Sequence, residues 1–95
     1  MSEWKFAQRE ESEHLCQLHF FCVTKKSGEH DVEFKITVKE YLTPPDPMMR
    51  FLAESEKQTN QSVTPFTPVG WGRTLLDALS QCIRSIERFP YQGPI

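Results

Sequence analysis

The sequence predicts a small α+β domain, in which an antiparallel three-stranded β-meander packs against a C-terminal α-helix and a short helix precedes the third strand. Two patterns carry this prediction. In residues 32–39, apolar side chains alternate with charged or polar ones, as in a strand with one face on a core. Between residues 75 and 89, apolar side chains recur every three or four positions, as in a helix with one buried stripe.

Size and composition indicate one domain, residues 1–95. A chain of 95 residues with 38% hydrophobic and 25% charged residues suits a single modest core. No apolar run approaches the roughly 18 residues that cross a bilayer, and the first residues lack the cationic start and apolar stretch of a signal peptide. We therefore expect a cytoplasmic protein without a membrane partner.

Charge and cysteine content argue against a nucleic-acid-binding protein and against a disulfide-bonded one. The net charge is −2 and the basic residues form no stripe, so we expect no binding to nucleic acid. Cys16, Cys22 and Cys82 are an odd number without a close pair, which favours reduced thiols over a disulfide framework.

The first strand is predicted from residues 14–25, which are rich in apolar side chains. Both alternating sets are substantially apolar, so the pattern indicates a central strand covered at least in part on both faces. Residues 26–31 form a turn in which Gly28 is free to adopt a positive φ, and residues 32–39 complete a β-hairpin. For residues 1–13 we expect an arm or a short strand, with a helix as the weaker alternative.

Prolines organise the middle of the chain. The segment 43–47 ends the second strand, and Asp46-Pro47 is a good helix start because Asp suits the N-cap and Pro the first helical position. The apolar cluster that follows predicts a helix of two or three turns. Residues 58–62 are a polar loop, and residues 63–71 carry Pro65 and Pro68, which limits them to an edge strand or an extended segment.

The final helix is predicted to start after Thr74, which suits the N-cap, with Asp77 placed to complete a capping box. Pro90 ends it. Its predicted core stripe is Leu75, Leu79, Cys82, Ile83, Ile86 and Phe89.

Few residues suggest chemistry. In a strand, His14, Cys16 and Cys22 share a side but span about 27 Å, while His19 points the other way, so we expect no metal site and no cofactor. The Gly70–Thr74 segment precedes a helix N-terminus that could bind an anion, although a tight turn is the commoner reason for such glycines. The alternative function is that of a small enzyme, or of a subunit of one, which uses the His14/Cys16 or the Gly70–Thr74 region.

Three aromatic residues suggest an interaction surface. Phe66, Trp71 and Tyr91 lie outside the two best core stripes and flank the proline-bearing strand and the tail after the helix. They either serve a protein partner or self-association, or plug the ends of a small core.

The segment Gly72-x-Thr74-x-x-Asp77-Ala78 resembles the helix entry of HicB-like antitoxin domains. That family has a three-stranded meander followed by a helix, and the resemblance implies a small partner-binding domain that masks a toxin, often as an oligomer. The chain departs from the family in having no DNA-binding appendage and a long segment, 44–62, before the third strand. We therefore expect a non-catalytic interaction or regulatory domain.

Overall fold

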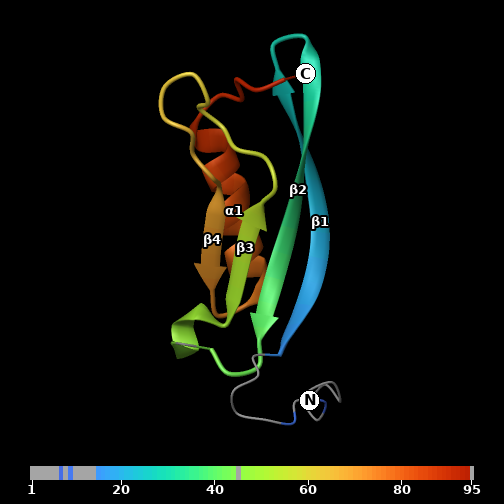
Figure 1. Cartoon of the computed structure of the whole chain (residues 1–95), viewed down its shortest axis with the longest axis vertical. Helices are drawn as coiled ribbons and strands as arrows, with labels where there is room; N and C mark the ends of the chain where they lie inside the picture. Colours follow the sequence, from blue (N-terminus) through green and yellow to red (C-terminus); the bar gives the residue numbers. More distant parts are fainter. Residues whose placement is uncertain (1–6, 8, 10–14, 45, 95) are drawn as a thin grey trace.

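A computed structural model describes residues 7, 9, 15–44 and 46–94. The expected arm or strand at residues 1–13 falls almost wholly outside this part of the chain, as does His14. The described residues form one four-stranded antiparallel sheet in the order β1-β2-β3-β4 and one C-terminal helix, so the α+β class is confirmed (Figure 1).

The first two strands make a long hairpin. β1 (Cys16–Ser27) and β2 (His30–Tyr41) have twelve residues each and are joined by a two-residue loop, with Ser27 opposite His30. Gly28 has a φ of 66°, as predicted, because a tight hairpin turn needs a residue that accepts positive φ. The turn is shorter than the predicted 26–31, and both strands are correspondingly longer.

The described residues already form four strands, so the prediction of three was wrong. The predicted short helix is reduced to a 3-10 turn, Pro47–Met49, in which the Asp46 side chain accepts a hydrogen bond of 2.8 Å from the Met48 N–H. The following residues form β3 (Phe51–Ser55), which pairs with β2 on one side and β4 (Val69–Gly72) on the other.

Tertiary pairing explains this correction. Leu52 and Ala53 are adjacent yet both buried, which a strand achieves by sending successive side chains to opposite faces. Helix propensity spans less than about 1 kcal/mol per residue for ordinary side chains, so pairing on both edges outweighs it. Of the predicted edge segment 63–71, only the part after Pro68 is strand.

The helix α1 (Leu75–Arg88) begins where predicted. The Thr74 hydroxyl accepts a hydrogen bond of 3.1 Å from the Asp77 N–H. Its buried face is Ala78, Cys82 and Ile86, with Leu75, Leu79 and Ile83 packed partly against the same core. From the sheet, the core receives Val32, Phe34, Ile36, Val38 and Ala53.

The helix covers the sheet unevenly. It contacts mainly β4 and β3, touches β2 less, and leaves β1 at the side, as Figure 1 shows. Close approach to β4 depends on glycine: a Cβ on Gly70 would lie 2.6 Å from the Cys82 nitrogen, and one on Gly72 would lie 2.8 Å from the Ala78 nitrogen.

One long-range contact ties the hairpin to the end of the helix. The Lys25 ammonium on β1 donates hydrogen bonds to the carbonyl oxygens of Ile86 at 2.8 Å and Phe89 at 2.7 Å. A cation is favourable there, because the last carbonyls of a helix have no intrahelical donor and carry partial negative charge.

Candidate interaction surface

The face of the sheet opposite α1 is not covered by any described element. We call it the open face. The register places the following side chains on it: Leu18, Phe20, Cys22 and Thr24 from β1, Glu33, Lys35, Thr37, Lys39 and Tyr41 from β2, Leu52 and Glu54 from β3, and Val69 and Trp71 from β4. Its β2 and β3 parts are rich in charged residues, whereas its β1 part is largely apolar.

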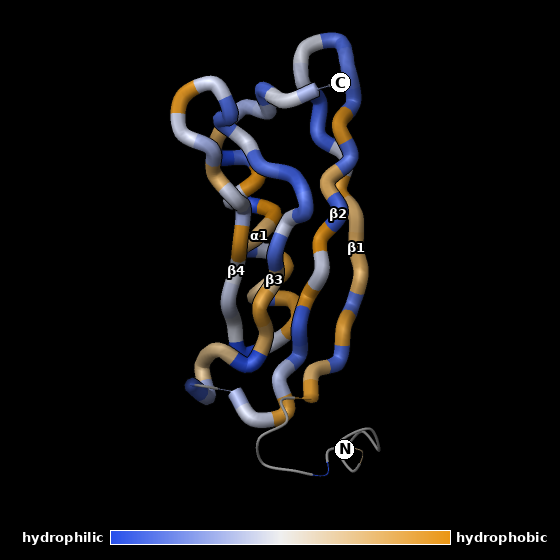
Figure 2. The backbone as a smooth tube through the Cα atoms, in the orientation of Figure 1, coloured by the Kyte–Doolittle hydropathy of each residue, from blue (hydrophilic) through white to orange (hydrophobic). Residues whose placement is uncertain are grey.

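The exposed apolar side chains of β1 are large. Phe20 is 72% exposed and Leu18 is 47% exposed. In Figure 2 hydrophobic colour recurs along β1, although this strand forms the outside of the sheet. Beside Phe20 the open face has a shallow hollow of about 480 Å³, whose lining includes Phe20, Cys22, Glu33, Lys35, Thr37 and Glu56.

The outer edge of β1 offers free backbone groups. In a hairpin closed by a two-residue loop, Ser27 and His30 exchange hydrogen bonds, so odd-numbered residues of β1 point their N–H and C=O groups towards β2 and even-numbered residues point theirs outward. Within the described part of the chain, no hydrogen bond reaches the outward groups of Leu18, Phe20, Cys22 or Thr24.

This location corrects the prediction of a central strand. Residues 14–25 have apolar side chains in both alternating sets, yet β1 lies at the edge of the sheet that the described residues form. On the helix side, Phe21 and Val23 pack against the core but are only half-buried, because α1 lies over β3 and β4. A long apolar edge strand is unusual in soluble proteins, which normally protect such edges with charge, proline or a covering element.

The opposite edge of the sheet, β4, is protected by side chains of the helix. The Trp71 N–H donates a hydrogen bond of 2.8 Å to the Gln81 side-chain oxygen, and the Val69 carbonyl accepts one of 3.2 Å from the Ser85 hydroxyl. Side chains of α1 thus form hydrogen bonds with the outward backbone groups of β4 to which a further strand would have to bind. Strand addition at β4 would have to break these bonds, whereas addition at β1 breaks none in the described residues.

The three aromatic residues expected at an interaction surface have different surroundings. Trp71 is half-buried on the open face, where its ring stacks on Tyr41 with centroids 6.3 Å apart. Phe66 is half-buried and meets the Phe89 ring edge-on at 5.1 Å. Tyr91 is only 8% exposed and belongs to the core.

The structure therefore does not gather these aromatics on one surface. Tyr91 meets the Phe34 ring edge-on at 5.7 Å, and its hydroxyl donates a hydrogen bond of 2.6 Å to the Pro94 carbonyl. Phe66 precedes β4, whereas Trp71 lies within that strand, five positions further along the chain. The sequence did not single out Phe20 and Leu18, although both belong to one of the two alternating apolar sets in residues 14–25.

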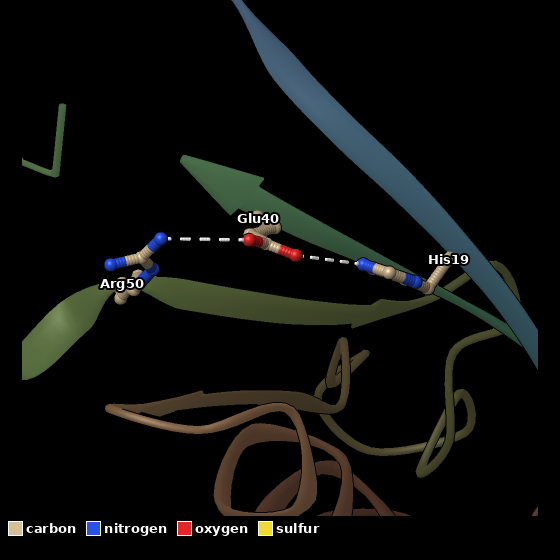
Figure 3. A network of polar contacts seen from close by, with 3 residues as sticks. All are labelled: His19, Glu40 and Arg50. Atoms are coloured by element: carbon tan, nitrogen blue, oxygen red, sulfur yellow. Dashed lines mark hydrogen bonds and ion pairs between the residues drawn. The ribbon is translucent and has the colours of Figure 1, made fainter. Parts of the chain in front are cut away.

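A polar network crosses the sheet on its helix-facing side. His19 Nε2 on β1 lies 3.1 Å from Glu40 Oε1 on β2, and an Arg50 guanidinium nitrogen before β3 lies 3.7 Å from Glu40 Oε2 (Figure 3). The Glu40 side chain is 17% exposed, so the two neighbours stabilise a carboxylate that is largely withdrawn from water. The network links β1, β2 and the residue that precedes β3.

The Gly70–Thr74 segment, which suggested an enzyme, and Cys82 have structural explanations in the fold. Gly70 and Gly72 are accounted for by the close approach of α1 to β4, and Thr74 by the helix cap. Cys82 is buried, and this burial, followed by the negative charge of Glu54, raises the pKa of its thiol to about 11, which disfavours the nucleophilic thiolate. Among the described residues, no three His, Cys, Asp or Glu side chains gather so that they could hold a metal ion.

Within the residues that the structure describes, no helix has the length and apolar character needed to span a membrane. Comparisons with protein-family models, with curated proteins and with solved structures found no significant match to this chain. The resemblance of its helix entry to HicB-like antitoxin domains therefore stays a prediction.

Proposed function

We propose that this chain is a non-catalytic protein-interaction domain, which binds an extended segment of a protein partner along the outer edge of β1. One observation carries the proposal: β1 has the two-sided apolar character of a central strand but has no neighbour on its outer side among the described residues. A partner strand paired with that outer side would place β1 between two strands, which is the position that its apolar residues suit.

The added strand would make two kinds of contact. Its backbone would pair with the outward groups of Leu18, Phe20, Cys22 and Thr24, whose spacing repeats every second residue. Its side chains would cover Phe20 and Leu18, and burying their exposed apolar surface contributes about 3 kcal/mol. Backbone pairing supplies affinity with little demand on sequence, and the apolar pair supplies a preference for apolar partners.

The distribution of charge favours β1 over the middle of the sheet as the site of this contact. The four outward residues Leu18, Phe20, Cys22 and Thr24 carry no charge, whereas Glu33 and Lys35 of β2 are exposed on the open face. Removing those charges from water would oppose binding.

Selection from a library of phage-displayed 12-residue peptides tests the proposal. We expect the selected peptides to be extended and apolar, and to lose at least tenfold in affinity for the Phe20→Lys variant. Leu76→Lys is the matched control, because Leu76 on α1 is 70% exposed and Phe20 is 72% exposed. Selected peptides that bind Phe20→Lys as tightly as the wild type would contradict the proposal.

Trp71→Ala distinguishes β1 from the aromatic surface expected from the sequence. Trp71 lies on β4, three strands from β1, which is about 14 Å across the sheet. Peptide binding at β1 should be insensitive to Trp71→Ala. Binding that is lost in Trp71→Ala and kept in Phe20→Lys would assign the function to the surface around Trp71 instead.

A further inference from the structure

Building on the proposed function, we infer that the partner strand is β1 of a second copy of this chain. The two strands pair antiparallel about a two-fold axis that passes beside Phe21, and the two sheets join into one sheet of eight strands. Such a contact is isologous, because the same residues meet on both sides.

The free backbone groups determine the register. Outward groups must face outward groups, and Leu18, Phe20, Cys22 and Thr24 are centred on residue 21. Placing Phe21 on the axis sets Leu18 opposite Thr24 of the second copy and Phe20 opposite its Cys22. All four free residues of each strand are then paired, and none of these positions carries a charge.

Both faces of β1 suit this register. On the open face, Phe20 packs beside the apolar Cys22 of the second copy, while the flanking Lys26 meets Cys16 rather than another cation. On the helix side, the two Phe21 rings become direct neighbours, with Cβ atoms about 5 Å apart. Phe21 is only half-buried in the single chain, so this pairing covers apolar surface that the fold leaves partly exposed.

The second copy also has room. The helix lies over β3 and β4, so β2 and β1 of each copy separate the two helices in the joined sheet (Figure 1). The C-terminal tail meets the far end of the hairpin, where the Ser27 hydroxyl donates a hydrogen bond to the Tyr91 carbonyl. Neither element stands in the way of residues 18–24.

Sedimentation velocity of the full chain tests this inference. The chain is measured at concentrations between about 5 and 500 μM, the range in which weak homodimers form. We expect the weight-average mass to rise from 11.1 kDa towards twice that value for the wild type and for Leu76→Lys. Phe20→Lys should raise the dimer dissociation constant at least tenfold, and its circular dichroism should match the wild type because Phe20 is exposed. A wild type that stays monomeric at the highest concentration, or Leu76→Lys weakening association as much as Phe20→Lys, overturns the inference.

Oxidative cross-linking tests the register in a Cys16→Ser background. A Phe20→Cys, Cys22→Ser chain mixed with a chain that keeps Cys22 should form a disulfide between the two, because opposed residues in this register have Cα atoms about 5.5 Å apart. Each chain alone should cross-link poorly. Efficient cross-linking of Cys22 to Cys22 would mean a shifted register and would contradict the axis at Phe21.

The two proposals fail differently. A chain that stays monomeric but binds selected peptides through Phe20 refutes the second copy as partner and keeps the interaction function. A chain that neither self-associates nor binds peptides refutes both.

Discussion

Replacing Lys25 by methionine keeps the aliphatic stem and removes the ammonium group that bridges β1 and the end of α1. The Ile86 and Phe89 carbonyls then lose donors at 2.8 and 2.7 Å. A hydrogen bond from a charged donor contributes about 1.5–3 kcal/mol, and a cation at a helix C-terminus contributes about 0.3–1 kcal/mol. Lys25 is half-buried and water can partly replace it, so we expect a total loss of about 2 kcal/mol.

Urea unfolding followed by circular dichroism measures this loss. With a slope of about 1 kcal/mol/M, typical of a small domain, the midpoint should fall by about 2 M. Lys26→Met is the matched control, since the neighbouring Lys26 is exposed and makes no hydrogen bond or ion pair within the described residues. Equal midpoints for the two variants would refute the view that Lys25 caps the helix.

Three further predictions concern the helix and its contact with β4. Thr74→Ala should destabilise the fold by about 1 kcal/mol in urea unfolding, because the Asp77 N–H loses its acceptor. Gly70→Ala should cost more, about 2–3 kcal/mol by the same measurement, since the new methyl group meets the helix backbone. The pKa of the Cys82 thiol is raised to about 11 in the fold, so its protonated form stabilises the protein below pH 9 and this contribution is lost as the pH rises towards 11. Unfolding at pH 8–11 should show a loss of about 2–3 kcal/mol that Cys82→Ala lacks.

The parts of the fold that sequence predicted correctly depend on local signals. Thr74 and Asp77 lie three residues apart, so the cap that starts α1 is readable without the rest of the chain. The alternation in residues 32–39 likewise identifies β2 because its two faces differ in polarity. Gly28 marks the hairpin for a similar reason, since a two-residue loop needs a positive φ.

The parts that sequence missed depend on distant partners. Phe51–Ser55 became a strand because β2 and β4 flank it, and no local pattern encodes that position in the sheet. Lys25 looks like an ordinary surface residue, but its two acceptors lie 61 and 64 residues further along the chain.

Strand order decides the candidate site in the same way. The apolar pattern of residues 14–25 predicted a central strand, but it could not show that β1 would be at the edge of the sheet that the described residues form. Nor could the pattern of residues 63–71 show that Gln81 and Ser85 would close the edge of β4.

Amide hydrogen exchange in residues 18–24, resolved by NMR, tests most directly whether β1 has a free edge that takes up a strand. In the Phe20→Lys monomer, the outward amides of Leu18, Cys22 and Thr24 should exchange rapidly, while those of Phe21 and Val23, bonded to β2, stay protected. In the wild type at 500 μM, or about tenfold above the dissociation constant of a bound peptide, the outward amides should become protected as well. Outward amides that are already protected in the monomer, or that stay unprotected when the chain associates, would contradict the account.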